Sequence, residues 1–195
     1  MPRPTAPARR TLAHQVRIIG GQWKRTLLPV ADRPGLRPTP DRVRETLFNW
    51  LGQDLTGWRC VDAFAGTGAL GLEAASRGAA DVLLVEAEGA LVDQLRAVVR
   101  RLDAANVRVQ RGNALSVLAG LAAASVDLVF LDPPFEADLF DKALAAARPA
   151  VTAEGFIYLE APAAWEGEAL ARHGVESVRH MKAGAVHGHL LRRTA

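Results

Sequence analysis

Four consecutive residues, Asp132-Pro133-Pro134-Phe135, follow an apolar run at 126–131 and could hold an aromatic amine for chemical attack. The Asp132 carboxylate and the Pro133 carbonyl can each accept an N–H, and the two prolines stiffen the turn. Phe135 can stack on a nucleobase that has been turned out of its helix. The amino group of guanine or adenine is a poor nucleophile, because its lone pair is delocalised into the ring. The motif therefore predicts catalysis that depends mostly on positioning.

The chemical role expected of Asp132 follows from its acidity. A carboxylate with an ordinary pKa of about 3.9 is too weak a base to deprotonate a neutral aromatic amine. We therefore expect Asp132 to stabilise the positive charge that develops on the nitrogen. Taken alone, the motif could be an ordinary proline turn. Its position after a glycine-rich loop favours the catalytic interpretation.

That loop is the segment Asp62-Ala63-Phe64-Ala65-Gly66-Thr67-Gly68. Together with Gly71 it makes a G-x-G-x-x-G pattern between a predicted strand and a predicted helix, which is typical of dinucleotide-binding folds. Such a site directs a helix N-terminus at an anionic pyrophosphate, which the Asp62 carboxylate would repel. S-adenosyl-L-methionine has a cationic sulfonium and an amino group, and both suit a carboxylate. We expect this cofactor, with contacts at Asp62, Phe64, Gly66 and Gly68.

Polar residues also follow the next two predicted strands. Glu86 ends the second strand, where a carboxylate would meet ribose hydroxyls at the carboxyl edge of the sheet, and both cofactor interpretations predict it. Asn113 can donate and accept hydrogen bonds, so it could contact an adenine edge, with Ala114 adding backbone contacts. Either Glu86 or Asn113 could instead cap a helix.

Alternating strands and helices must position these residues. Alternation of this kind implies parallel strands joined by crossover helices, so we expect a Rossmann-like α/β core over residues 58–195. A terminal hairpin could form from 175–181 and 186–191. The predicted strands are 59–64, 81–85, 107–110, 126–131 and 155–160, and the predicted helices are 69–77, 90–102 and 139–147.

Positive charge is concentrated ahead of this core. Residues 1–59 carry eleven Lys or Arg and four Asp or Glu, a net charge of +7, whereas the whole chain carries +3. Residues 1–14 are rich in Pro, Arg and Ala, and we expect a disordered tail there. Residues 15–57 predict a β-hairpin, from 16–19 and 26–30, and then a helix that begins near Asp41 and ends at Leu51.

Clustered cations indicate a polyanionic partner, because phosphate contacts need no particular base sequence. We expect the hairpin to be an RNA-facing ribbon with a basic tip, and the helix to present arginines on its exposed face. The expected RNA-binding residues are Arg17, Lys24, Arg25, Arg42 and Arg44.

Several other classes of protein are disfavoured. No apolar run approaches the ~18 residues of a membrane span, and the start lacks a secretory signal, so we expect a cytoplasmic location and no membrane partner. The single cysteine, Cys60, cannot form an internal disulfide. His187 and His189 share one face of a predicted strand without acidic or cysteine company, so we expect no metal site.

Four blocks of sequence, at residues 17–23, 37–51, 62–68 and 132–135, resemble the bacterial 16S ribosomal RNA guanine-N2 methyltransferase family, the type that modifies guanine 966 in RNA numbering. The resemblance implies a seven-stranded sheet whose last strand is antiparallel, with S-adenosylmethionine as the donor. It implies 16S ribosomal RNA, within a 30S assembly intermediate, as the partner. It also implies the amine-binding and donor-binding roles described above for the matching residues.

Two other functions are kept as alternatives. A DNA adenine or cytosine amino-methyltransferase would use the same D-P-P-F chemistry, although the short chain leaves little room for a separate DNA-reading domain. From another class, a non-catalytic nucleic-acid-binding module could have an inactive fold or hold a nicotinamide nucleotide. Binding of S-adenosylmethionine against NAD would separate these possibilities.

Overall fold

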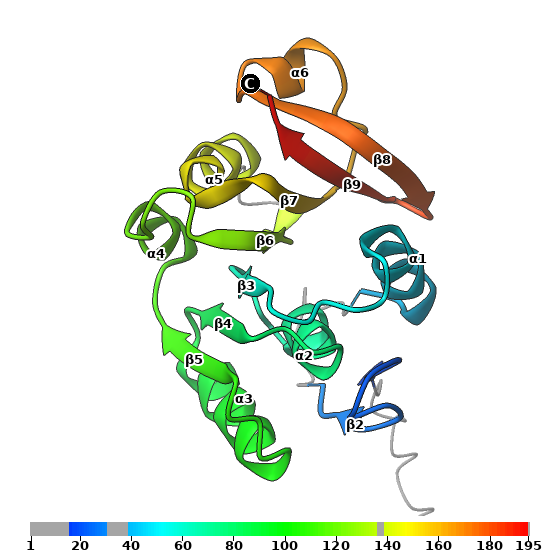
Figure 1. Ribbon diagram of the computed structural model, residues 1–195, viewed down its shortest axis with the longest axis vertical. Helices are drawn as coiled ribbons and strands as arrows, with labels where there is room; N and C mark the ends of the chain where they lie inside the picture. The colour runs from blue at the N-terminus through cyan, green and yellow to red at the C-terminus, as the bar shows by residue number, and fades with distance from the viewer. Residues whose placement is uncertain (1–15, 31–38, 136–138, 195) are drawn as a thin grey trace, which may run out of the picture.

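A seven-stranded sheet forms the centre of the protein, whose computed structural model describes residues 16–30, 39–135 and 139–194 (Figure 1). Five neighbouring strands are parallel, and the last strand of the chain is antiparallel to both of its neighbours. The predicted Rossmann-like α/β fold is therefore confirmed. In order across the sheet the strands are β5 (Val107–Arg111), β4 (Asp81–Glu86), β3 (Arg59–Asp62), β6 (Val126–Leu131), β7 (Val151–Ala161), β9 (Val186–Arg193) and β8 (Val175–Ala183).

Helices cover both faces of this sheet. One apolar cluster joins the sheet to α1 (Asp41–Leu51), α2 (Ala69–Ser76) and α3 (Gly89–Arg101). A second cluster, on the opposite face, joins it to α4 (Ala114–Ala119), α5 (Phe140–Ala147) and α6 (Glu168–Ala171). Figure 1 shows α1 and α2 on one side of the central strands and α4 and α5 on the other. This layering leaves the carboxyl edge of the parallel strands for the functional motifs.

The predicted N-terminal hairpin is present but short. It consists of β1 (Val16–Arg17) and β2 (Leu27–Leu28), which pair antiparallel. Ile18 still pairs across the hairpin, since its N–H donates to the Thr26 carbonyl at 2.9 Å. The pairing goes no further because the N–H groups of Ile19 and Gly20 donate to the Glu73 carboxylate of α2 at 2.7 Å each. A carboxylate from another helix thus takes donors that a longer ribbon would use.

The glycine-bearing tip of the hairpin packs on the end of α2. The Gln22 N–H donates to the Ser76 carbonyl at 2.8 Å, and Gly21 has a φ of 74°. A Cβ on Gly21 would lie 1.8 Å from the Ser76 carbonyl oxygen, so only glycine allows this approach. Lys24 and Arg25 remain exposed beside the packed tip. The expected RNA-facing ribbon therefore has one face against the protein.

Other differences from the predicted elements are local. Two short helices, α4 and α6, were not among the predicted helices, and β7 begins at Val151 instead of Gly155. A register shift where β6 meets β7 accommodates the added length of β7. The predicted tail at 1–14 and most of the Pro-rich connector at 34–40 lie outside the described residues. Among the helices that the structure describes, none combines the length and apolar character needed to cross a membrane.

Candidate active site

Three carboxylates come together where neighbouring parallel strands end. Asp62 is the last residue of β3, Asp132 follows β6, and Glu160 lies one residue before the end of β7. The registers pair Asp62 with Phe130 and Leu131 with Leu159. Because parallel strands present their carboxyl ends at one edge, the glycine-rich loop and the D-P-P-F motif lie at the same place, as the sequence predicts.

Asp62 is held inside the protein by the helix that follows the loop. Its side chain is 2% exposed, and Oδ2 accepts the Gly71 N–H at 2.9 Å. Burial raises the pKa of Asp62 to about 7, against the opposing effect of the Gly71 hydrogen bond. A Cβ on Gly71 would lie 2.2 Å from a methyl carbon of Leu84 and 3.0 Å from the Asp62 Cβ. The glycine therefore lets α2 lie directly on the sheet.

The Glu86 side chain is hydrogen-bonded to the glycine-rich loop. It ends β4, and its carboxylate accepts the N–H groups of Gly66 at 3.0 Å and of Glu88 at 2.9 Å. Gly66 and Gly68 have φ of 51° and 77°, in the region that favours glycine. Glu86 is half-buried, and so is Phe64. The structure thus brings Asp62, Gly66 and Glu86 together, as predicted for donor-binding residues.

Asn113 has the helix-capping role that was kept as the alternative. Its Oδ1 accepts the Ser116 N–H at 3.1 Å at the start of α4, and Ala114 is buried in the first turn. A capping oxygen does not occupy the amide nitrogen of the side chain, so contact with an adenine edge stays a prediction. Because Asn113 follows β5, it lies at the carboxyl edge with Glu86.

Asp132 lies in surroundings that change its acidity. Burial is the largest cause, and the neighbouring Glu160 and Asp62 carboxylates add to it, so that the pKa of Asp132 is well above its ordinary value. The ordinary pKa near 3.9 expected from the residue type is therefore wrong for Asp132. Pro133 is buried, whereas the Phe135 ring is 37% exposed and lies 6.1 Å from the Phe140 ring. The motif thus places an exposed aromatic ring beside a half-buried carboxyl group.

The predicted RNA-binding residues divide into two groups. Lys24, Arg25 and Arg42 are exposed, and Arg17 is exposed with its Nε 2.7 Å from Asp41. The prediction that Arg44 lies on an exposed helix face is wrong. Its side chain is fully buried and donates to Asp41 at 2.6 Å and to Glu73 at 3.3 Å. Burial lowers the pKa of Arg44, and the two carboxylates oppose that effect.

Three buried side chains at or near the site were not among the residues predicted from the sequence: Glu73, Tyr158 and Glu160. Glu73 and Glu160 each stand alone among apolar residues, in Ala69-Leu70-Gly71-Leu72-Glu73-Ala74-Ala75 and in Ile157-Tyr158-Leu159-Glu160-Ala161. A charged residue in such a run is buried only when it has partners, and that was the available signal.

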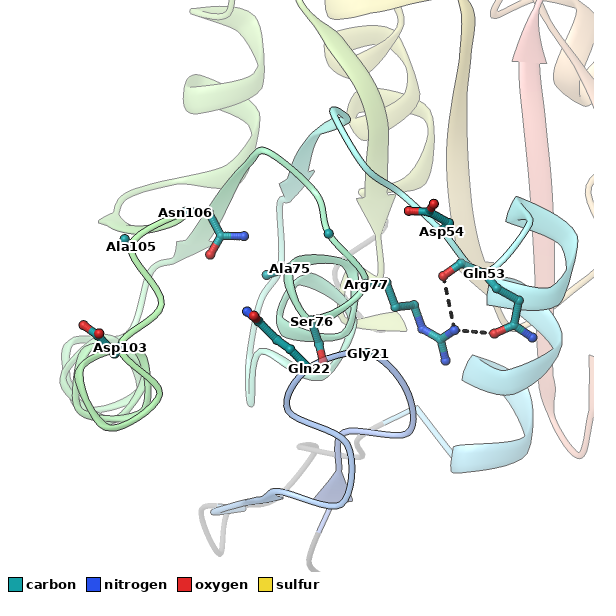
Figure 2. Close-up of a pocket in the computed structure, with 11 residues that line it drawn as sticks. Gly21, Gln22, Gln53, Asp54, Ala75, Ser76, Arg77, Asp103, Ala105 and Asn106 are labelled. Atoms are coloured by element: carbon teal, nitrogen blue, oxygen red, sulfur yellow. Dashed lines mark hydrogen bonds between the residues drawn. The ribbon is translucent and has the colours of Figure 1, made fainter.

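A wide hollow with a volume of about 680 Å³ lies at the opposite, amino edge of the sheet (Figure 2). Figure 2 shows Arg77 reaching toward Gln53, to whose backbone and side-chain oxygens its Nη1 donates. The residues that line it precede β3, β4 and β5 or belong to the hairpin tip. The hollow is therefore separate from the edge that carries the two motifs.

The histidines considered for metal binding contact one another and the backbone. The Nε2 atom of His180 lies 2.9 Å from the Nδ1 atom of His187. The Nε2 atom of the buried His189 accepts the Trp165 N–H at 3.0 Å. Burial lowers the pKa of His189 to about 4, so its imidazole is neutral at pH 7. Within the described ranges, no group of three or more His, Cys, Asp or Glu side chains has an arrangement that could hold a metal ion.

The strand order and the glycine-rich loop at its carboxyl edge define a Rossmann-like α/β protein with the fold seen in methyltransferases. Within that class, residues 16–192 match the model of the family described as "Conserved hypothetical protein 95", and the chain belongs to this family.

Individual relatives carry more specific names. Ribosomal RNA small subunit methyltransferase D of Escherichia coli K12 is 52% identical over 130 residues, which are 67% of this chain and 65% of that protein. The protein of the same name from Haemophilus influenzae is 41% identical over 133 residues, covering 67% and 69%. A solved structure named "Putative methyltransferase yhhF from Escherichia coli" has a TM-score of 0.79 at 42% identity, covering 93% of this chain and 99% of that one. The first match thus spans slightly less than two thirds of that relative's length.

Proposed function

We propose that this protein transfers a methyl group from S-adenosylmethionine to the exocyclic N2 amine of a guanine in 16S ribosomal RNA, within a 30S assembly intermediate in the cytoplasm. The observation that carries the proposal is the position of Asp132 at the carboxyl edge of the sheet, next to Asp62 and the glycine-rich loop. The names of the relatives, ribosomal RNA small subunit methyltransferase D, support ribosomal RNA as the substrate.

The residues at this edge suit the proposed methyl donor. Bound S-adenosylmethionine would supply an electrophilic methyl group. Asp62 offers a carboxylate to a cationic ligand, and Glu86 offers a second one that already closes the loop through the Gly66 N–H. Asn113 and Ala114 follow at the same edge, where they would border an adenine ring, and Phe64 lies within the loop. The dinucleotide alternative is disfavoured because the Asp62 carboxylate would repel a pyrophosphate, whereas Glu86 is expected with either cofactor.

Asp132 and Pro133 would hold the target amine through two acceptor oxygens, and Phe135 would stack on the base. The partly exposed Phe135 ring is supported from behind by Phe140 of α5. With both N–H groups engaged, the amine nitrogen keeps one orientation, which lowers the entropic part of the barrier. The half-buried carboxylate of Asp132 would also stabilise the positive charge that the nitrogen gains.

Binding of the methyl donor is expected to depend on pH through Asp62. In the free protein the pKa of Asp62 is about 7, so the carboxyl is protonated below that pH and loses its attraction for a cation. Donor affinity should therefore be highest above pH 7 and should weaken as pH falls through 7, by up to about tenfold per pH unit. Calorimetry with S-adenosylmethionine from pH 5 to 8 measures this. Asp62→Asn should bind weakly without this slope, and a wild-type affinity independent of pH would contradict the assignment.

RNA affinity is expected to depend on salt through the exposed cations of the N-terminal segment. Replacing Lys24, Arg25 and Arg42 together with glutamine should reduce the slope of log affinity against log salt by roughly two to three, because each lost phosphate contact removes about one released counterion. Filter binding to a small-subunit RNA fragment at several salt concentrations measures the slope. Arg108→Gln, an exposed arginine paired with Asp81 at the other side of the sheet, is the control. Equal slopes for the triple variant and the wild type would contradict the prediction.

The proposed function is tested by methyl transfer from labelled donor to three substrates: naked 16S RNA, small-subunit particles and duplex DNA. Incorporation at N2 of one guanine, located by mass spectrometry of RNA fragments, is the expected result. Label in duplex DNA and none in RNA would favour a DNA amino-methyltransferase. Binding of NAD and not S-adenosylmethionine would refute the methyltransferase proposal.

A further inference from the structure

Glu160 is a buried carboxylate beside the amine-binding motif that the proposed reaction leaves without a role. Its side chain lies in β7 and is 3% exposed. β6 and β7 pair in parallel, with Leu131 opposite Leu159. The residue that follows in each strand direction is Asp132 after β6 and Glu160 in β7, so these two residues lie beside each other. Residues paired in this way point to the same face of a sheet. Two carboxyl groups therefore lie side by side where the target amine would bind.

Two hydrogen bonds hold the Glu160 carboxylate in place. The Tyr158 hydroxyl donates to its Oε1 at 3.0 Å, and the buried Thr39 hydroxyl forms a second hydrogen bond. The positive charge of Arg44 also favours its ionised form. Gly188 lies opposite Glu160 on β9, and a Cβ there would be 2.7 Å from the Tyr158 hydroxyl oxygen. The glycine thus leaves the space in which the hydroxyl reaches Glu160.

The two carboxyl groups differ in how strongly they hold a proton. Around Asp132, the charged or titratable groups are Glu160 and Tyr158 from β7 and Asp62 from β3, while Arg44 of α1 acts on Glu160. Burial and then Glu160 raise the pKa of Asp132 well above its ordinary value. Burial also raises the pKa of Glu160, but the Thr39 and Tyr158 hydroxyls and Arg44 oppose that rise. Asp132 is therefore the better proton acceptor of the pair.

We infer that Glu160 is a positioning residue that acts through Asp132 and makes it the acceptor of the proton that the methylated amine must lose. The inference rests on the proposed function. The nitrogen lone pair forms a bond to the methyl carbon of the sulfonium donor, while the C–S bond breaks and its electron pair stays on sulfur. The nitrogen then carries a positive charge and one surplus proton. That proton passes to an Asp132 oxygen, and the nitrogen keeps the electron pair of the N–H bond.

The pH profile of kcat for the full-length protein tests this inference. If ionised Asp132 is the active form, the rate rises with pH through its pKa. Glu160→Gln removes the neighbouring charge, so the acid side of the profile should move to lower pH by about one unit, with a roughly tenfold lower plateau. Glu160→Asp keeps the charge and should keep the midpoint of the acid side. Glu154→Gln, an exposed site at the other end of β7, should match the wild type.

A Glu160→Gln profile whose midpoint stays within about 0.3 unit of the wild type, whatever its plateau, would overturn the inference. A purely structural role would lower the rate without moving the midpoint, and donor affinity by calorimetry separates the two. If Glu160→Gln does not fold, carboxyl-carbon NMR of the wild type decides, because two strongly coupled carboxyls titrate in two steps. Independent one-step titrations of Asp132 and Glu160 would overturn the inference. Absence of methyl transfer by the wild type would refute the proposed function instead, and the NMR titration would still test the pair.

Discussion

Asp132→Ala should lower methyl transfer to RNA by on the order of 10² or more while leaving the affinity for S-adenosylmethionine nearly unchanged. The substitution removes the acceptor for one N–H of the target amine and the negative charge nearest to the nitrogen. It also removes the proton acceptor that Glu160 is inferred to support. The hydrogen bonds that hold Asp62 and Glu86, the proposed donor-binding residues, do not involve Asp132, so binding of the donor should persist.

Single-turnover kinetics with labelled donor and saturating RNA would measure this loss, with calorimetry for donor affinity. Asp93→Ala is a suitable control, because the Asp93 side chain is 80% exposed on α3. Near-wild-type turnover in Asp132→Ala would count decisively against the proposed mechanism. A loss of donor binding equal to the loss of rate would mean that the residue belongs to the donor site instead.

Glu73→Ala should lower the free energy of unfolding by about 3–5 kcal/mol, because it removes one partner from a buried network of charges. The Glu73 carboxylate is fully buried and accepts four donors, from the Ile19 and Gly20 backbone, Arg44 and Arg77. Alanine would leave two buried guanidinium groups and two N–H groups without this partner. The hairpin and α1 would lose their common attachment to α2.

Urea unfolding followed by circular dichroism would measure the change, and the N-terminal segment should become more sensitive to protease. Glu45→Ala, an exposed acid on α1, should change stability by less than about 0.5 kcal/mol. Glu73→Gln keeps the shape and one acceptor oxygen, so its loss should be smaller than that of alanine. A loss below about 1 kcal/mol for Glu73→Ala would show that solvent replaces the network.

Elements with a strong local pattern were predictable. β6 was predicted at its observed limits, 126–131, and α3 within one residue at each end, because alternation and helical spacing are properties of neighbouring residues. The meeting of the glycine-rich loop with Asp132 was also predictable, since successive parallel strands end at one edge.

Arg44 shows how a residue type can mislead. Its spacing from Leu47, Phe48 and Leu51 places it on the buried face of α1, yet an arginine was expected to be exposed. Its main buried partner, Glu73, is 29 residues away on another helix. The helical spacing indicated burial, and Asp41, three residues earlier, supplies one ion-pair partner. Nothing near Arg44 in the chain indicated Glu73, the buried carboxylate that is its second partner.

The amino-acid sequence by itself determined the order of the elements, the edge at which the motifs gather and the residues able to hold a donor and an amine. Local periodicity and short motifs depend on residues that are close in the chain, so they can be recognised without a fold. Only the tertiary structure decided that β3, β6 and β7 are neighbours. It also brings the buried Asp62 and Glu160 together with the half-buried Asp132 at one edge of the sheet. The acidity of those carboxyl groups depends on burial and on charges from distant segments, and packing alone creates both.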